Sequence, residues 1–136
     1  MRSKTRVLVV DDHKAVRRGL SDLLDQEPDL AVIAAVESAE QALAMVEDHP
    51  IDLAIVDICL GQMDGLELTR RLRSQYPDVH IVILSMHEPS TYADKAIQAG
   101  ASGYVAKQEA GETLLATIHR VLDGPMQFKN VTPPLS

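Results

Sequence analysis

Strand-like and helix-like segments alternate five times along this chain, and this alternation restricts its fold more than any other feature. Short runs rich in aliphatic residues predict strands at residues 6–10, 30–36, 51–56, 79–84 and 102–105. Each run is followed by a segment in which apolar residues recur at helical spacing. Five βα units in tandem predict an α/β fold, with one doubly wound parallel sheet and helices on both of its faces.

Local signals mark several helix ends. Ser38 and Asp64 are each followed three residues later by Gln or Glu, a pattern typical of a capped helix start. Pro89 suits the first turn of a helix that ends before Gly100. These signals divide the chain into short elements of the length that βα units require.

The composition describes an ordinary globular chain. It has 136 residues, of which 46% are hydrophobic and 24% charged, which favours one domain with an adequate core. A formal net charge of -7 argues against general binding to nucleic acid or a membrane surface, since both need clustered Lys and Arg. With a single cysteine, no long apolar run and no signal peptide, we expect a cytoplasmic location.

The predicted domain covers residues 1–124, and residues 125–136 differ from it in character. The sequence Gly124-Pro125 stops the last helix, and three prolines in the final segment leave little room for another element. We therefore expect a linker or C-terminal tail over residues 125–136.

Polar side chains gather where the predicted strands end. Asp11 and Asp12 follow the first strand and Asp57 the third, while Ser85 and Lys107 lie at the ends of the fourth and fifth. The carboxyl ends of parallel strands meet at one edge of a sheet, where open α/β folds hold their ligands. Carboxylates packed together repel unless a cation offsets them, and Mg²⁺ prefers such ligands together with phosphate oxygens. An aspartate can also act as a nucleophile, so this edge predicts a phosphoryl-transfer site.

Each of these residues also has a simpler interpretation when taken alone. Asp11 and Asp12 suit a cap of the first helix, and Asp57 suits a surface loop. Ser85 suits a turn, and Lys107 a solvated surface position. Only their shared edge favours a site.

His13 and Cys59 lie close in sequence to the acidic residues. His13 follows the Asp11-Asp12 pair and is a candidate ligand or base, although the five histidines show no paired metal spacing and most are interpreted as surface residues. Cys59 is a candidate redox thiol, with a passive side chain as the favoured interpretation.

Four motifs carry a resemblance to a known family. They are Val9-Val10-Asp11-Asp12-His13, the Asp57 strand with Met63-Asp64-Gly65 after it, Ile83-Leu84-Ser85, and Gly100-Ala101-Ser102-Gly103-Tyr104-Val105-Ala106-Lys107. From about Thr5 to Gly124 the chain resembles the receiver domain of bacterial two-component response regulators, and most resembles the LuxR/FixJ/NarL-type subfamily. The resemblance implies a flavodoxin-like (βα)5 fold with strand order 2-1-3-4-5.

The resemblance also implies roles at the acidic edge. Asp57 would be the phosphoacceptor, and Mg²⁺ would be held by Asp12, Asp57 and the backbone carbonyl of Cys59. Asp11 would act mainly through a metal-bound water.

Three further residues would link the phosphoryl group to a conformational change. Lys107 would contact the Asp57 carboxylate and then the phosphate, and Ser85 would move to hydrogen-bond the phosphate. Tyr104 would follow Ser85 inward as the second switch residue, unless it is an ordinary half-buried strand residue.

The chain departs from the family's common residues near this edge. Gly61 and Gln108 stand where many receivers have proline, and Met86 is larger than the usual small residue. Cys59 and His87 lie two residues past Asp57 and Ser85, where side chains flank the approach of the phosphate.

The expected partners follow from the same resemblance. They are a sensor histidine kinase as donor, a second copy through the first and fifth helices or through the fourth helix, fifth strand and fifth helix, and DNA only through a C-terminal domain absent from this chain. No membrane partner is expected.

A stand-alone or phosphate-independent receiver-like module remains an alternative. So does an aspartate-nucleophile phosphatase, although that chemistry needs a second carboxylate where Cys59 stands.

Overall fold

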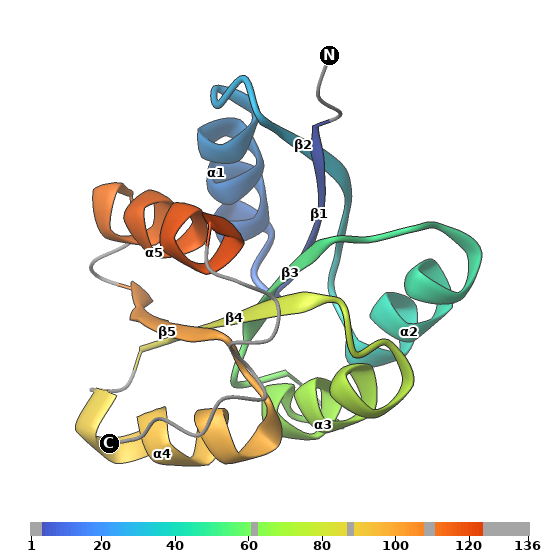
Figure 1. Cartoon of the computed structure of the whole chain (residues 1–136), viewed down its shortest axis with the longest axis vertical. Coiled ribbons are helices and arrows are strands. Elements are labelled where there is room, and N and C mark those ends of the chain that lie inside the picture. Colours follow the sequence, from blue (N-terminus) through green and yellow to red (C-terminus); the bar gives the residue numbers. More distant parts are fainter. Residues whose placement is uncertain (1–3, 61–62, 87–88, 108–110, 124–136) are drawn as a thin grey trace.

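Five strands and five helices alternate along the chain in the computed structural model, which describes residues 4–60, 63–86, 89–107 and 111–123 (Figure 1). The strands are β1 Thr5–Val10, β2 Leu30–Val36, β3 Leu53–Asp57, β4 His80–Ser85 and β5 Gly103–Ala106. The helices are α1 Lys14–Asp25, α2 Ala39–Asp48, α3 Gly65–Gln75, α4 Pro89–Ala99 and α5 Glu112–Asp123. The predicted βα alternation is confirmed.

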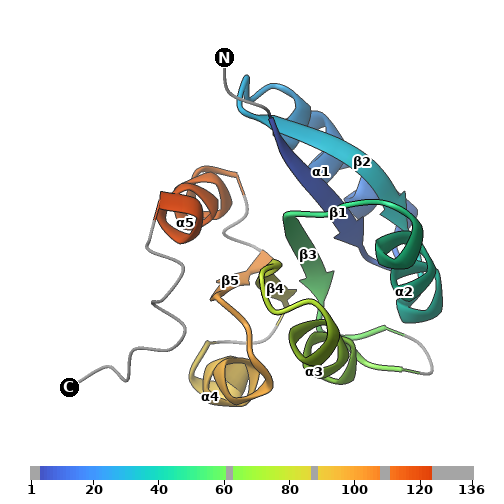
Figure 2. The same cartoon turned by 45° about the vertical axis from the view of Figure 1, so that its right-hand side comes forward.

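The strands form one parallel sheet in the order β2-β1-β3-β4-β5. Helices α1 and α5 cover one face, and α2, α3 and α4 cover the other (Figures 1 and 2). The order reverses direction beside β1, which is the flavodoxin-like arrangement. The predicted fold class and strand order are therefore confirmed.

Alternate residues of the central strands pack on opposite faces of the sheet. Val7 and Val9 of β1 pack with α1 and α5, whereas Leu8 and Val10 pack with the three helices on the other side. Both faces are covered, so the central strands are apolar at nearly every position. Every residue of β3 is buried, including its last residue, Asp57.

Two of the predicted helix caps are present. Ser38 Oγ accepts a hydrogen bond from the backbone N–H of Gln41 at 3.1 Å, and Asp64 Oδ1 accepts one from Glu67 at 2.8 Å. Helix α1 begins differently, because its N-cap residue is His13 and no side chain makes the capping bond. The alternative that Asp11 or Asp12 caps the first helix is therefore wrong.

Four of the five strands differ from their predicted bounds by one or two residues, and β3 differs most. We expected the third strand at residues 51–56, but β3 covers Leu53–Asp57 and Asp57 pairs with Leu84 of β4. Ile51 is buried in the core without belonging to the strand. A run of apolar residues in the sequence indicates which residues are buried, whereas the bounds of a strand are set by its pairing with neighbouring strands. For β3 the buried run and the paired residues have different bounds.

Two remaining points concern the C-terminal segment and membrane-spanning helices. Residues 125–136 lie outside the described residues, so the expected linker or tail stays a prediction. Among the residues that the structure describes, no helix is long and apolar enough to cross a bilayer.

Candidate functional site

Four strand ends bring the predicted site residues to one edge of the sheet. Asp11 directly follows β1, Asp57 ends β3, Ser85 ends β4, and Lys107 directly follows β5. Lys107 Nζ lies 3.0 Å from Asp11 Oδ2 and 3.2 Å from Asp57 Oδ2. One ammonium group therefore bridges two carboxylates from neighbouring strands.

Both of these carboxylates are removed from solvent. Asp11 is 1% exposed and Asp57 is 2% exposed. Burial raises the pKa of Asp57 above its ordinary value, and the negative charge of Asp11 adds to that rise. The N–H of Cys59 and the charge of Lys107 oppose it without cancelling it. The negative charges of Asp11 and Asp57 are therefore compensated only in part at this edge of the sheet.

Lys107 remains a cation in spite of its own burial. Burial lowers the pKa of its ammonium group, but the hydrogen bond to Asp11 and the charge of Asp57 raise it, and the net direction is upward. A lysine held in this way offers a fixed positive charge to any anion that enters the site.

Each buried carboxylate has one oxygen held by the backbone and one turned toward Lys107. Asp57 Oδ1 accepts from the Cys59 N–H at 3.1 Å, and Asp11 Oδ1 accepts from the His13 N–H at 2.8 Å. The two Oδ2 atoms are buried, and both are ion-paired with the ammonium group of Lys107. Lone pairs on these oxygens remain available to a further cation.

Asp12 and His13 lie at the open side of the same cluster. The Asp12 side chain is 42% exposed, and His13 Nδ1 lies 3.0 Å from Asp12 Oδ1 and 3.2 Å from Asp11 Oδ1. Potential ligand atoms of Asp11, Asp12, His13 and Asp57 all lie within 4.8 Å of one another. Three carboxylates with spare oxygen lone pairs fit a divalent cation such as Mg²⁺.

Cys59 contributes its backbone rather than its thiol. Its N–H donates to Asp57, while its side chain is exposed. Partial burial and the negative charge of Asp57 raise the pKa of the thiol, which favours the unreactive protonated form. This weighs against the redox interpretation of Cys59.

Arg17 is a site neighbour that the sequence did not reveal. Its Nη1 donates to the backbone carbonyl of Asp11 at 2.8 Å, and its side chain is largely buried. Its Nη2 lies 3.9 Å from Glu37 Oε1, at the end of β2. Nothing in the sequence distinguishes it from an ordinary helix arginine, since the contact depends on how α1 packs beside β1.

The two predicted switch residues lie on neighbouring strands. Ser85 is fully buried at the end of β4, one residue beyond the partner of Asp57 in the sheet. Tyr104 pairs with Ile83 and is half-buried against the core on the side of α2, α3 and α4. Met86 is 69% exposed beside Ser85. Gly61, His87 and Gln108 lie outside the described residues.

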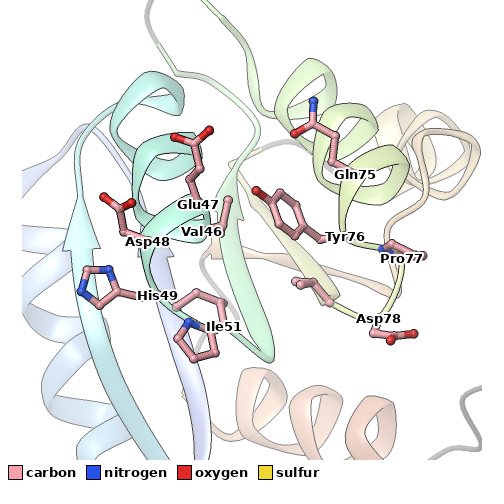
Figure 3. Close-up of a pocket in the computed structure, with 11 residues that line it drawn as sticks. Val46, Glu47, Asp48, His49, Ile51, Gln75, Tyr76, Pro77 and Asp78 are labelled. Atoms are coloured by element: carbon pink, nitrogen blue, oxygen red, sulfur yellow. The ribbon is translucent and has the colours of Figure 1, made fainter.

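Two other features lie away from this edge. His119 of α5 lies 3.2 Å from Asp29 and 3.9 Å from Glu27, which makes a second, more exposed cluster. A hollow of 480 Å³ lies between the α2–β3 and α3–β4 connections at the opposite edge of the sheet (Figure 3). None of the predicted site residues lines that hollow.

Comparison with known proteins yields one family and several relatives. The family described as "Response regulator receiver domain" matches residues 7–119. The chain is 34% identical over 122 residues to the transcriptional regulatory protein DegU of Brevibacillus brevis, covering 90% of this chain and 52% of DegU. It is 40% identical over 125 residues to the DNA-binding transcriptional activator DevR/DosR of Mycobacterium tuberculosis, covering 92% of this chain and 58% of that protein.

A solved structure agrees with these relatives. The crystal structure of a LuxR-family two-component response regulator from Aurantimonas sp. SI85-9A1 superimposes with a TM-score of 0.83 at 36% identity. The match covers 88% of this chain and 86% of that one. The chain spans somewhat more than half the length of the two curated relatives.

Proposed function

The chain belongs to the response regulator receiver domain family, and we propose that it works as a phosphoryl-accepting switch centred on Asp57. The family is one of signalling domains rather than of enzymes with an external substrate. One observation carries the proposal: a buried aspartate at the end of β3 shares a buried lysine with a second aspartate. Burying charged side chains costs free energy of folding, and buried clusters of this kind are concentrated at functional sites.

In the proposed reaction, a carboxylate oxygen of Asp57 attacks the phosphorus of a phosphohistidine. The new oxygen–phosphorus bond forms as the phosphorus–nitrogen bond breaks, and the electron pair leaves with the donor's imidazole. The Cys59 N–H holds Asp57 Oδ1, which fixes the orientation of the carboxylate before attack. Lys107, already 3.2 Å from Asp57 Oδ2, offsets the negative charge that the phosphoryl group brings.

The acidic edge would hold Mg²⁺ through residues that already lie together. Asp12, Asp57 and the backbone carbonyl of Cys59 would ligate it directly, and Asp11 through a water. The ion would neutralise charge on the phosphoryl oxygens during transfer. The single ammonium of Lys107 does not balance the three clustered carboxylates of Asp11, Asp12 and Asp57, and this excess negative charge supports the assignment.

Ser85 and Tyr104 would convert the phosphate into a change of shape. Phosphorylation adds strong acceptor oxygens and negative charge beside the end of β4. A hydroxyl that bonds the phosphate only in the phosphorylated state biases a two-state equilibrium toward that state. Tyr104 is half-buried on the neighbouring strand and would respond to a movement of Ser85.

The output that we propose is control of transcription. DegU and DevR/DosR are transcriptional regulators, and the chain matches only about half of each. Residues 1–124 would therefore be the receiver domain of a longer regulator, with residues 125–136 leading to a LuxR-type DNA-binding domain.

A sensor histidine kinase would supply the phosphoryl group. Dimers would form through α1 and α5 or through α4, β5 and α5. A cytoplasmic location fits the unpaired thiol of Cys59.

The test is phosphorylation of the purified chain with acetyl phosphate and Mg²⁺. We expect one acid-labile phosphoryl group in the wild type and none in Asp57→Asn. Asp52→Asn is the matched control, because it removes a carboxylate at the opposite edge of the same sheet. Equal labelling of Asp57→Asn and wild type would refute the assignment.

A second measurement separates the switch from a module that works without phosphate. Beryllofluoride, which mimics the phosphoryl group, should change the NMR signals of Ser85 and Tyr104 when Mg²⁺ is present. Unchanged signals would favour the phosphate-independent alternative.

A further inference from the structure

We propose that Arg17 of α1 is a positioning residue, which fixes the peptide between Asp11 and Asp12 and so holds the acidic edge in its metal-binding geometry. This role rests on the proposed function, because it concerns carboxylates that would hold the ion. It gives a task to a side chain outside the acidic cluster and joins the end of β2 to the site.

The first support is the contact that Arg17 makes. Its Nη1 donates to the backbone carbonyl of Asp11 at 2.8 Å. The donor is charged, and the side chain is only 17% exposed, so this hydrogen bond is strong and water competes little for it. The carbonyl belongs to the planar peptide that joins Asp11 to Asp12. Holding its oxygen therefore fixes the backbone from which the Asp12 side chain starts.

The second support is that α1 lacks the usual devices that fix the start of a helix. No side chain caps it at His13, and its first turn contains no acidic residue. The turn before α1 is held through Asp11, whose N–H donates to the Val36 carbonyl at 3.0 Å and whose Oδ1 accepts from the His13 N–H at 2.8 Å. Arg17 supplies the bond at the remaining backbone group of Asp11.

The third support is the unfavourable place that this cation occupies. Arg17 is the fourth residue of α1, and a positive charge near the amino end of a helix is disfavoured by the helix dipole. Withdrawing the guanidinium from water adds a further cost. The bond to the Asp11 carbonyl offsets both costs, which an ordinary solvated arginine would not incur.

Arg17 also connects the acidic edge to the end of β2. Its Nη2 lies 3.9 Å from Oε1 of Glu37, which directly follows β2. The Glu37 side chain is 62% exposed, so this pair is weak and serves to orient the guanidinium. The Glu37 N–H in turn donates to the Gln41 side chain of α2 at 2.9 Å. One planar group with several donors thus spans the ends of β1 and β2.

The proposal can be tested sharply because Arg17 would affect a bound Mg²⁺ in two opposite ways. Its positive charge repels the ion, so charge alone predicts tighter Mg²⁺ binding when the guanidinium is removed. Loss of the bond to the Asp11 carbonyl frees the peptide before Asp12, so positioning predicts weaker binding. Groups that orient metal ligands from outside typically contribute about ten- to hundredfold to affinity. The direction of the change therefore distinguishes the two effects.

The experiment measures Mg²⁺ binding to the full chain by calorimetry in wild type, Arg17→Met and Arg18→Met. Arg18 is the matched control, because it carries the same charge on the next residue of α1 but is exposed. We expect Arg17→Met to bind Mg²⁺ about tenfold more weakly. Arg18→Met should bind it as the wild type does or slightly more tightly. Equal or tighter binding in Arg17→Met would overturn the proposal.

Phosphorylation by acetyl phosphate separates positioning from general damage to the fold. With limiting Mg²⁺, Arg17→Met should be labelled more slowly than the wild type, and saturating Mg²⁺ should restore the rate. A rate that stays low at saturating Mg²⁺ would mean that the variant is damaged beyond metal binding, and it would overturn the positioning role.

A measurement on the metal-free wild type does not depend on whether the variant folds. NMR should show restricted rotation of the Arg17 guanidinium, with separate signals for its two Nη atoms, because Nη1 is held by the Asp11 carbonyl. The two Nη signals of Arg18 should be averaged by rotation. Averaged signals from Arg17 would overturn the proposal.

Failure of the proposed function would look different. If Asp12→Asn and Asp57→Asn bind Mg²⁺ as tightly as the wild type, the acidic edge is not the metal site and both proposals fall. If those variants lose Mg²⁺ while Arg17→Met keeps its affinity, only the role of Arg17 is wrong.

Discussion

Two ion pairs at opposite edges of the sheet have nearly the same length and very different surroundings. At the amino edge, Arg6 Nε lies 2.9 Å from Asp52 Oδ2, with side chains 45% and 37% exposed. At the carboxyl edge, Lys107 Nζ lies 3.0 Å from Asp11 Oδ2, with side chains 10% and 1% exposed. The distance between charged atoms is therefore no guide to function. The two pairs differ in burial instead, because the Arg6–Asp52 pair is partly solvated and the Lys107–Asp11 pair is kept out of water.

The pKa values of the two edges move in opposite directions. The hydrogen bond from Arg6 holds the pKa of Asp52 below its ordinary value, because that pair is satisfied in the folded state. Burial raises the pKa of Asp57, because its charge is poorly compensated. The charges at the amino edge are thus compensated, whereas the negative charge at the carboxyl edge is compensated only in part and would be offset further by a bound cation.

The largest expected effect comes from removing the shared lysine. Lys107→Met leaves Asp11 and Asp57 buried without their cation, and breaking a buried pair in this way costs about 3 to 5 kcal/mol in the free energy of unfolding. Arg6→Met at the amino edge should cost much less, because its pair is solvated. Urea unfolding without metal measures both. Similar losses in the two variants would remove the contrast between the edges.

The next effect tests how tightly the backbone is packed beneath Asp57. A Cβ at Gly65 would overlap the backbone carbonyl of Asp57 and approach Ile58 Cα at 2.8 Å. Gly65→Ala should therefore destabilise the fold by about 1 to 3 kcal/mol and reduce phosphorylation.

The control for that variant is Gly19→Ala in α1. Apart from its chain neighbours and the backbone of its own helix, no described atom lies within 4 Å of a Cβ at Gly19, so replacing this helical glycine should stabilise the fold by about 1 kcal/mol. Thermal unfolding measures both changes. If Gly65→Ala leaves the stability unchanged, the backbone of Asp57 and Ile58 can shift easily to accommodate the added methyl group.

The pH dependence of stability should have opposite signs at the two edges. The folded pKa of Asp52 is lowered, so its contribution is present above the unfolded pKa and is lost as pH falls through the folded value. Asp52→Asn should destabilise the fold near neutral pH by less than about 1 kcal/mol, and the difference should vanish in acid.

Asp57 should behave in the reverse way. Its folded pKa is raised, so its favourable contribution is present below the unfolded pKa and is lost as pH rises through the folded value. Asp57→Asn should therefore be more stable than the wild type near neutral pH without metal, and the gain should shrink in acid. Urea titrations across pH measure both variants. The same sign in both would contradict the comparison.

The smallest expected effect concerns Cys59. Its backbone N–H contacts Asp57 while its side chain is exposed, so Cys59→Ala should keep that bond and alter stability by less than about 0.5 kcal/mol. Phosphorylation with acetyl phosphate should continue at a similar level. A large loss of labelling would show that the thiol itself takes part.

Much of the site was predictable because parallel strands bring their carboxyl ends to one edge. That rule united Asp11, Asp57, Ser85 and Lys107 from separate parts of the sequence. It did not reveal the contact of Arg17 with the Asp11 carbonyl, or the approach of His13 Nδ1 to two carboxylates. Those contacts depend on side-chain direction and helix packing, which periodicity does not encode.

The sequence by itself determined the fold class, the strand order expected from the resemblance, the helix caps at Ser38 and Asp64, and the residues that gather at the acidic edge. These follow from local periodicity, local capping bonds and the geometry of a parallel sheet. Only the tertiary structure decided that β3 runs through Asp57 and that Lys107 is shared between two aspartates. It also decided that Asp52 is solvated while Asp57 is buried. The reason is that burial and shared contacts depend on every surrounding element, whereas a sequence pattern reports one element at a time.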